Sequence, residues 1–503
     1  MTIGRSVAVS VTGVTGQMVD IEADVSTGLP GLVLIGLPDA ALSESKDRVR
    51  SAITNSGFEL PKHRTTINLS PASVPKQGSA FDVGIAVAVL VGTGLISAES
   101  VAGWVHIGEL ALDGRLRPVP GILPALRALA DAGYSRVVVP VGNADEAQLV
   151  PGLEVRAVPS LREVAIVHGA DIEPISVESI GSPHAAEQGE FDGDLCDVVG
   201  QPEVVDALIV AAAGGHHLML LGPPGAGKTM LAARLPGILP QLTVDESLAV
   251  TSIQSVSRAG AVNRLAKRPP FEAPHHTATG VSLIGGGSGH IRPGAISRAH
   301  CGVLFLDEAP EFSATTLDAL RQPLESGSVV VHRANSVVEF PARFHLVIAA
   351  NPCPCGLSGG DDGMCACTAQ VKRRYLGKIS GPLLDRIDIR ISVRRVSAAH
   401  LRAGLPVVSS IEARASVERA RQRARSRWGD INARISGRIL RDPRFALESS
   451  VTAPLDRALE RGALTMRGVD RTLRIAWTLA DLDDAERPTA GHIHRALFLR
   501  QGI

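Results

Sequence analysis

The segment GPPGAGKT, at positions 222–229, brings together residue types that can hold a polyphosphate. It matches the phosphate-binding loop pattern, in which glycines let the backbone curl so that its N–H groups point at phosphate oxygens. An apolar run, HHLMLL (216–221), precedes the loop and predicts a buried strand, while MLAARL after it predicts a helix whose N-terminus favours an anion. The loop residues predicted to bind the nucleotide are Gly222, Pro223, Pro224, Gly225, Ala226, Gly227, Lys228 and Thr229.

A second segment supplies a carboxylate for the metal that accompanies a nucleotide. CGVLFLDE (301–308) is an apolar run that ends in two acidic residues, as expected for a buried strand leading into a site. In phosphate-loop proteins the lysine reaches the β- and γ-phosphates, while the loop hydroxyl and a strand-end aspartate hold Mg²⁺. We therefore expect Lys228 on the phosphates, Thr229 and Asp307 on the metal, and ATP with Mg²⁺ as cofactors.

Two further polar residues predict hydrolysis in addition to binding. Glu308 follows the metal ligand directly and is expected to be the base that polarises the attacking water, a role that the ligand itself cannot fill. Asn351 ends another apolar run, FHLVIAAN (344–351), and is expected to orient the same water. Glu308 and Asn351 are therefore the first predicted catalytic residues.

The chain of 503 residues is long enough for two or three domains with ample core. Its net charge is zero, and aromatic residues make up 3%, which argues against binding single strands mainly by base stacking. The first residues, MTIGRSVAVSVTG, show no signal-peptide pattern. The longest apolar run (83–98) is too short and glycine-rich to span a bilayer and predicts a core helix, so we expect a cytoplasmic protein without membrane contact.

Composition divides the chain into three predicted regions and a linker. Residues 1–181 mix strand-like and helical runs, and the polar segment 182–195 is typical of a linker. Residues 196–398 alternate strand and helix, the pattern of a parallel α/β sheet, and 399–503 turn helical and arginine-rich. The regions must bring the loop, the acidic strand end and Asn351 to one edge of that sheet.

Longer motifs carry a more specific resemblance. VVGQ (198–201), FEAPHHTATGVSLIGGG (271–287), RPGAISRAHCGVLFLDEAPEF (292–312) and NPCPCG (351–356) resemble the ComM/YifB family of magnesium-chelatase-like AAA+ ATPases over nearly the whole chain. The resemblance implies an AAA+ core with a helical C-terminal lid, and a homo-hexameric, ATP-driven motor that moves branched DNA in recombination. A chelatase-like or protein-remodelling ATPase that does not act on DNA is the alternative.

The resemblance also nominates two arginines. SGPLLDRIDI (380–389) resembles the segment that supplies an arginine finger, so Arg386 is expected to reach the nucleotide of a neighbouring subunit and offset charge on the γ-phosphate. Pairing with Asp385 or Asp388 within its own chain is the alternative. The segment 466–482 resembles a sensor-2 helix, in which Arg467 is expected to contact the phosphates and Arg471 is the competing assignment.

Candidate DNA contacts lie in two predicted projections. The stretch SVVVHRANSVVEF (328–340) predicts a hairpin, and His332 and Arg333 near its turn are the first candidates. The glycine-rich tip of the family's insertion offers His290 and Arg292. Such contacts to the phosphate backbone would be sequence-blind and sensitive to salt. Exposed turns with ordinary charges are the alternative for each.

An arginine-rich run, ERARQRARSRW (418–428), has arginines at a spacing of two. This spacing distributes the side chains around a helix instead of along one face. We expect a solvated lid helix with ion pairs between subunits in preference to a nucleic-acid surface.

Four of the six cysteines, in the pattern C-x-C-x9-C-x-C, follow the Asn351 strand end. In a cytoplasmic chain, four thiols this close favour structural zinc over a disulfide, although C-x-C departs from the usual C-x2-C spacing. A redox switch and free thiols are the alternatives. The candidate zinc ligands are Cys353, Cys355, Cys365 and Cys367.

The N-terminal region resembles the Lon-protease fold, through PKQGSAFDVGIAVAVL (75–90) and HIGELALDGRLRPVPGILPALRALADAG (106–133). Aligning the motifs puts Ala80 at the nucleophile position and Ala125 at the lysine position of the Lon Ser–Lys dyad. Without a hydroxyl and an amine, covalent peptide hydrolysis has neither nucleophile nor base. We expect a non-proteolytic α+β domain that supports ring assembly or binds DNA.

Overall fold

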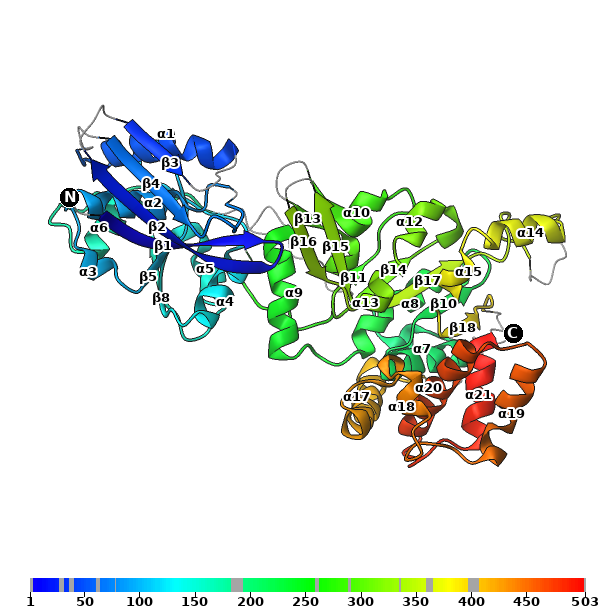
Figure 1. Cartoon of the computed structure of the whole chain (residues 1–503). Coiled ribbons are helices and arrows are strands. Elements are labelled where there is room, and N and C mark those ends of the chain that lie inside the picture. Colours follow the sequence, from blue (N-terminus) through cyan, green and yellow to red (C-terminus); the bar gives the residue numbers. More distant parts are fainter. Residues whose placement is uncertain are drawn as a thin grey trace.

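The structure is a computed structural model, in which three parts follow one another along the chain (Figure 1). At positions 40–43, 333 and 336 it describes the backbone alone. Within the described residues, no helix combines the length and apolar character needed to cross a bilayer. The described residues are 3–26, 31–35, 40–59, 64–76, 78–181, 193–257, 262–287, 291–333, 336–358, 365–396 and 407–501.

The N-terminal part is built on a seven-stranded mixed sheet in the order β3-β4-β2-β1-β5-β8-β9. The predicted core helix forms as α2, whose residues are all buried, and it ends earlier than the apolar run does. The elements are β1 (Ile3–Thr12), β2 (Thr15–Ser26), β3 (Gly31–Ile35), α1 (Ala40–Asn55), β4 (Arg64–Ser70), α2 (Asp82–Gly92), α3 (Ala98–Val101), β5 (Trp104–His106), β6 (Glu109–Leu110), β7 (Leu116–Arg117), α4 (Ile122–Asp131), β8 (Arg136–Pro140), α5 (Ala144–Ala147), β9 (Glu154–Val158) and α6 (Leu161–Val167).

The central part is a five-stranded sheet in the order β11-β14-β17-β10-β18, and all of its strand pairs are parallel. Short apolar strands alternate with helices, which is the pattern that favours parallel pairing. The first elements are α7 (Pro202–Gly214), β10 (Leu218–Leu221), α8 (Lys228–Ile238), α9 (Val244–Ser257), β11 (Phe271–Glu272), α10 (Gly280–Ile284), β12 (Gly285–Gly286), β13 (Arg292–Pro293) and α11 (Ala295–Arg298). They continue with β14 (Val303–Leu306), α12 (Ala314–Asp318), α13 (Pro323–Ser326), β15 (Ser328–Arg333), β16 (Ser336–Pro341), β17 (His345–Ala350), α14 (Ala369–Leu376), α15 (Gly381–Leu384) and β18 (Ile389–Ser392).

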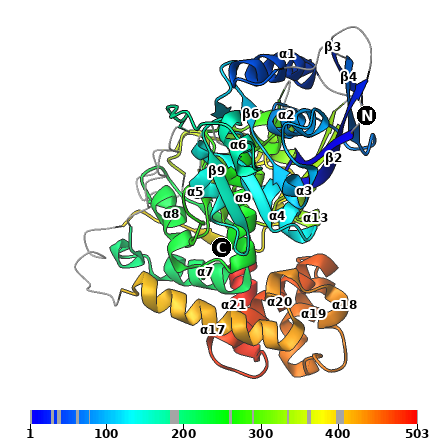
Figure 2. The same cartoon turned by 90° about the vertical axis from the view of Figure 1, so that its left-hand side faces the viewer.

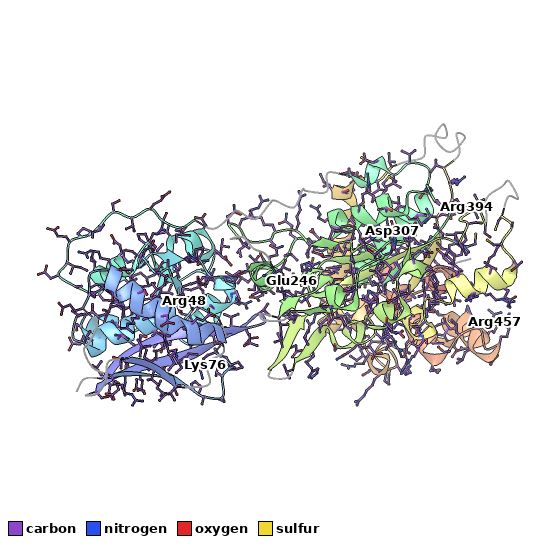
Figure 3. All side chains as sticks on the ribbon, turned by 90° about the horizontal axis from the view of Figure 1, so that it is seen from above. Arg48, Lys76, Glu246, Asp307, Arg394 and Arg457 are labelled. Carbon is purple, nitrogen blue, oxygen red and sulfur yellow. The ribbon has the colours of Figure 1, made fainter. Side chains whose placement is uncertain are left out.

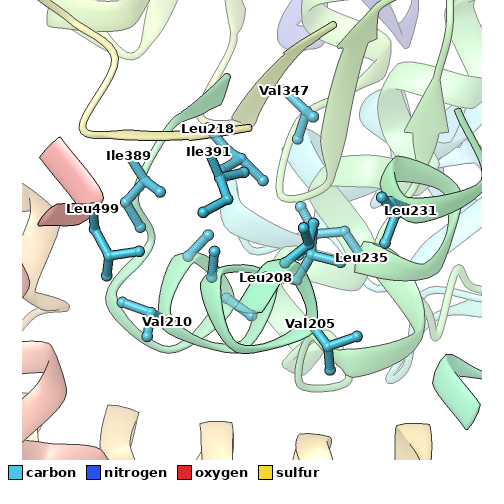
Figure 4. Packing of buried hydrophobic residues seen from close by; sticks show 14 of the residues in the cluster. Val205, Leu208, Val210, Leu218, Leu231, Leu235, Val347, Ile389, Ile391 and Leu499 are labelled. Atoms are coloured by element: carbon cyan, nitrogen blue, oxygen red, sulfur yellow. The ribbon is translucent and has the colours of Figure 1, made fainter. Parts of the chain in front are cut away.

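The C-terminal part is helical and packs against the central part through one shared core. Leu208 of α7, Ile389 of β18 and Leu499 of the last helix belong to the same buried cluster (Figure 4). Burial of such side chains stabilises the fold by about 1.5–3 kcal/mol each. The helices are α17 (Ser410–Trp428), α18 (Gly437–Leu440), α19 (Ser449–Glu460), α20 (Met466–Leu482) and α21 (Ala490–Gln501).

Two arginines of α17 are bound within their own chain, on a helix that the sequence predicted to be solvated, whereas Arg419 and Arg425 are exposed. Arg421 donates to the carbonyl of Ala212 from Nε and Nη2, at 3.0 and 2.7 Å. Burial lowers the pKa of Arg421 to about 10. Arg427 forms an ion pair with Asp481, which is fully buried. The long helix, seen along the lower edge of Figure 2 beside α7, is therefore bound to its own chain by these side chains.

The N-terminal and central parts meet at α9 and at the turn between β1 and β2. Leu248 of α9 packs against the N-terminal core, and Val14 of the turn packs against the core of the central part. A Cβ atom on Gly13 would lie 2.6 Å from Cγ1 of Val338 in β16. Figure 3 shows Glu246 of α9 between the two parts. The β1–β2 turn is therefore in contact with the hairpin that carries His332.

Candidate active site

The phosphate-loop segment leaves the carboxyl end of β10, a strand that lies between β17 and β18. Gly222 lies so close to the segment after β18 that a Cβ atom there would be 2.2 Å from the carbonyl oxygen of Val393. Gly227 has φ +87° and is the N-cap of α8, a left-handed conformation that favours glycine. The two glycines thus shape a loop that leads into the N-terminus of α8, where backbone N–H groups favour an anion.

Lys228 extends back across the loop instead of into solvent. Its Nζ donates to the carbonyl oxygens of Gly222 and Pro223, at 2.7 and 3.0 Å, and to Oδ1 of Asn351 at 3.0 Å. Burial lowers the pKa of Lys228, and the charges of the two carboxylates after β14 act in the opposite direction. The structure therefore brings the loop lysine and Asn351 together.

Asp307 and Glu308 follow β14, all four residues of which are buried. The hydroxyl of Thr229 donates to Oδ2 of Asp307 over 2.6 Å, and the N–H of Glu308 donates to Oδ1 of Asp307 over 2.9 Å. A hydroxyl and a carboxylate are oxygen ligands of the kind Mg²⁺ prefers, so the donor set fits the ion. Glu308 has φ +50°, a conformation that non-glycine residues seldom adopt.

A cavity of about 140 Å³ lies beside the loop. Gln201 forms part of its wall, and Nε2 of Gln201 donates to the carbonyl of Ala226 in the loop over 2.9 Å. The other walls include Val198, Gly200, Val407 and Val408. The two last residues follow a stretch outside the described residues and carry no motif, so sequence reasoning missed them.

Arg386 follows α15 and pairs within its own chain. Its Nη2 binds Glu325, and its Nη1 donates to the carbonyl of Pro382 over 2.7 Å. The side chain is 11% exposed. The acidic partner of Arg386 is therefore Glu325 on α13 instead of Asp385 or Asp388.

The two arginines of the sensor-2 segment have different surroundings. Arg471 binds Oδ1 of Asp388 and donates to the carbonyl of Arg386 over 3.1 Å. Burial acts to raise the pKa of Asp388, but His216 and Arg471 together hold that pKa well below its usual range. Arg467, on the first turn of α20, is exposed. Arg471 therefore contributes to a buried ion pair, whereas Arg467 faces solvent.

Three of the DNA-contact candidates lie on short antiparallel strand pairs, β15–β16 and β12–β13. His332 is exposed in β15 opposite Val337 of β16, and Arg333, of which only the backbone is described, pairs with Ser336. Arg292 is exposed in β13, opposite Gly286. His290 lies outside the described residues.

The four cysteines after β17 form a cluster. Their sulfur atoms all lie within 4.8 Å of one another, with Cys353 and Cys355 3.3 Å apart and Cys353 and Cys365 3.7 Å apart. Tetrahedral zinc with bonds of about 2.3 Å to sulfur would set its ligands about 3.8 Å apart. The thiol chemistry and the spacing of the cluster, completed by Cys367, therefore fit a zinc ion.

The segment that carries the cysteines contacts the loop at Gly356, next to Cys355. A Cβ atom on Gly356 would lie 2.6 Å from the ring of Pro224. Burial, together with the charge and hydrogen bond of Glu311, raises the pKa of Tyr375 to about 12. Tyr375 lies on α14, downstream of the cysteines, and Glu311 lies just after the acidic strand end. The segment that carries the cysteines thus contacts the phosphate loop, and the helix after it contacts the residues that follow the acidic strand end.

The Lon-like motif positions of the N-terminal part carry no pair of a hydroxyl and an amine. Ala125 is buried in α4, and Ala80 packs against the same core cluster. Ser79 binds Glu109, while the buried Lys76 binds the carbonyl of Pro71. The nearby serine and lysine are therefore bound to other partners.

The parallel sheet, the loop before α8 and the acidic end of β14 define the AAA+ class of phosphate-loop ATPases. Three family models match the chain: "Magnesium chelatase, subunit ChlI" at residues 194–401, "Subunit ChlI of Mg-chelatase" at 21–143, and "Magnesium chelatase, subunit ChlI C-terminal" at 408–500. The chain belongs to the magnesium chelatase ChlI-like family, together with its ComM and YifB homologues. Membership in this ATPase family implies ATP and Mg²⁺.

Relatives match over nearly the full length. An uncharacterised protein of Mycobacterium tuberculosis is 49% identical over 510 aligned residues, covering 100% of this chain and 99% of the relative. The competence protein ComM of Haemophilus influenzae and the protein YifB of Escherichia coli are each 39% identical, covering 97% of this chain and 95% of each relative. A Lon protease of Mycolicibacterium smegmatis is 29% identical over 180 residues, 34% of this chain, in line with the Lon-like N-terminal part.

Proposed function

We propose that this protein is an ATP-driven ring motor that moves branch points in DNA during recombination. The observation that supports it most is the assembly of Lys228, Asn351 and the Thr229–Asp307 pair at one edge of a parallel sheet. Similarity to a competence protein over nearly the whole chain adds the link to recombination.

Within this proposal, the residues of the loop and of the two strand ends have separate roles in hydrolysis. Lys228 exchanges its bonds to the loop carbonyls for bonds to the β- and γ-phosphates. Thr229 and Asp307 hold Mg²⁺, which neutralises charge on the phosphates. Glu308 accepts the proton of the attacking water, and Asn351, 3.0 Å from Nζ of Lys228, orients that water. The cavity walled by Val198 and Gln201 accommodates the base of the nucleotide, because Gln201 joins it to the loop.

The proposed ring is a homo-hexamer whose assembly depends on nucleotide or DNA. Arg386 acts on the nucleotide of the neighbouring subunit, for which it has to leave Glu325. Arg467 contacts the phosphates from α20, a role that its exposed position allows and that the buried pairing of Arg471 with Asp388 does not. Hydrolysis therefore requires neighbouring subunits.

The proposed DNA contacts are His332, Arg333, His290 and Arg292, acting on phosphates. His332 and Arg292 are exposed on antiparallel strand pairs of the central part, so both side chains are accessible to a phosphate backbone. The four-cysteine cluster is proposed to hold a structural zinc ion that braces the chain between β17 and α14. Neither the DNA-contact residues nor the cysteines take part in ATP hydrolysis.

ATP turnover in the presence of different ligands tests the proposal. We expect turnover to rise when a four-way DNA junction or a single strand is added, and the rise to fall steeply with salt. A polyanion without base pairs, such as heparin, is the control for charge alone. Turnover that no DNA stimulates would reject the motor and favour the chelatase-like or protein-remodelling alternative.

A further inference from the structure

Two adjacent histidines lie in the loop between β11 and α10, beside the candidate active site. Their rings are 4.1 Å apart between centroids and tilted by 34°. Nδ1 of His276 lies 3.5 Å from Oε2 of Glu308. Nδ1 of His275 instead lies 2.9 Å from the hydroxyl of Thr277, in its own loop. Only one member of the pair therefore contacts the proposed base.

The loop that carries His276 is anchored at both ends. Upstream, Glu272 of β11 forms an ion pair of 2.9 Å with Arg298 of α11, and β11 runs parallel to β14, the strand that ends before Asp307. Downstream, the hydroxyl of Thr279 accepts from the N–H of Ser282 and caps α10. These contacts hold the two ends of the loop beside the end of β14, which brings His276 within reach of Glu308.

Among the described residues, the side chain of Glu308 forms one ion-pair contact, the one with His276. Its side chain is 51% exposed, and its backbone has φ +50°. A half-exposed carboxylate ordinarily samples several rotamers, and a general base acts only when it lies within hydrogen-bond reach of the proton it abstracts. An imidazole 3.5 Å from the carboxylate oxygen limits the rotamers that the carboxylate can sample, most strongly when the imidazole is protonated.

We infer that His276 is a positioning residue for ATP hydrolysis, which holds the carboxylate of Glu308 in place through Nδ1. The inference rests on the proposed role of Glu308 as the base, and it adds a residue that the phosphate-loop and acidic-strand motifs do not contain. Because His276 acts through Glu308 and, among the described residues, forms no hydrogen bond or ion pair with the phosphate loop, its loss changes the rate of hydrolysis and leaves ATP binding unchanged.

The test measures kcat and the affinity for ATP separately, without DNA. His276→Ala is expected to lower kcat by about 10- to 100-fold, the cost of misplacing a catalytic group by about 1 Å, with the dissociation constant for ATP unchanged. His276→Gln keeps a side-chain N–H donor and is expected to restore part of the rate. His275→Ala, which removes the adjacent ring, is the matched control and is expected to change kcat little. His276 is 34% exposed, so the substitution is tolerated by the fold.

A double-variant cycle with Glu308→Gln separates positioning from a structural effect. If His276 acts through Glu308, adding His276→Ala to Glu308→Gln produces no further loss in single-turnover hydrolysis. Losses that multiply, or a wild-type kcat in His276→Ala, would overturn the inference. An unchanged kcat in Glu308→Gln alone would instead remove Glu308 as the base. An absence of DNA stimulation would reject the motor. Failure of the positioning role, of the base and of the motor can therefore be told apart.

Discussion

Three oxygen acceptors surround the ammonium group of Lys228: two carbonyls of its own loop and the amide oxygen of Asn351. A long, flexible side chain can exchange such acceptors for phosphate oxygens with little movement of the loop. The same ammonium lies near two carboxylates that follow β14. At the residue scale, the positive charge at this point is the property on which nucleotide binding depends.

Lys228→Ala is expected to weaken ATP binding by about 10- to 100-fold or more, since a charged hydrogen bond is worth about 1.5–3 kcal/mol. Titration with a fluorescent ATP analogue measures the change. Lys46→Ala in α1 of the N-terminal part is the control for loss of a positive charge. Retained affinity in Lys228→Ala would contradict the placement of the nucleotide.

A second residue-scale prediction concerns a buried histidine pair in the N-terminal part. Nε2 of His106 lies 2.9 Å from Nε2 of His168, and Nδ1 of His168 lies 3.1 Å from the carbonyl of Ser100. His168 therefore donates from Nδ1, and His106 donates from Nε2, with both rings neutral. Burial lowers the pKa of His106 to about 3 and also lowers that of His168.

Because the folded chain holds these pKa values below the ordinary value of about 6.5, the unfolded chain binds protons more readily. The stability that the neutral pair contributes is complete above pH 6.5 and is lost as the pH falls toward 3. Thermal unfolding at pH 7.5, 6 and 5 is expected to show a falling midpoint, and His106→Gln a weaker dependence. His494→Gln, which removes an exposed histidine, is the control and is expected to keep the wild-type pH dependence. An equal pH dependence in wild type and His106→Gln would contradict the role of the buried pair.

At the element scale, the segment between β17 and α14 links the cysteine cluster to the rest of the site. Gly356 packs against Pro224 of the phosphate loop, and Lys372 of α14 donates to the hydroxyl of Ser358 over 2.7 Å. A metal ion bound by the cluster would fix this segment against the loop, as structural zinc does in small motifs.

Metal analysis of protein purified without chelator is expected to give about one zinc per chain, the ratio of a four-thiolate site. Cys365→Ser removes one ligand and should lower the zinc content, whereas Cys196→Ser removes an exposed cysteine outside the cluster and should not. Zinc-free wild-type protein would end the proposal, and equal loss in both variants would place the metal elsewhere.

The sequence predicted those elements whose signals are local. Three predictions are confirmed: the parallel core sheet, the helical C-terminal region and the Lon-like N-terminal part. They could be predicted because alternating strands and helices, and long motifs, are visible in the sequence. The contact of His276 with Glu308 and the pairing of Arg386 with Glu325 could not be predicted, since each joins residues that are distant in sequence. The contacts of Arg421 and Arg427 within the chain could not be predicted either, because the spacing of the arginines does not show which groups lie opposite them.

At the scale of the whole molecule, the helical C-terminal part is bound to the sheet through the segment that carries Arg386. Arg471 of α20 binds the carbonyl of Arg386 and the carboxylate of Asp388, and Arg500 of α21 binds the carbonyl of Ile387. Movement of these helices with nucleotide state would therefore move the proposed finger. This coupling needs a ring, in which the finger of one subunit faces the nucleotide of the next.

Arg386→Ala is expected to leave ATP binding intact and to lower turnover by about 1000-fold, the usual worth of an arginine finger. Mixing it with Lys228→Ala, which keeps its own Arg386, is expected to restore part of the turnover, since one subunit supplies the finger and the other the intact site. Glu325→Gln frees Arg386 from its partner and should not lower turnover. Absence of complementation in a mixed ring would argue for action within one chain.

The most direct test of the motor is ATP-dependent movement of a labelled four-way DNA junction, with Glu308→Gln as the control that binds ATP and hydrolyses it slowly. We expect wild-type protein with ATP to resolve the junction into its product duplexes, and Glu308→Gln to leave it intact. Wild-type protein that hydrolyses ATP and leaves the junction intact would contradict the proposed motor.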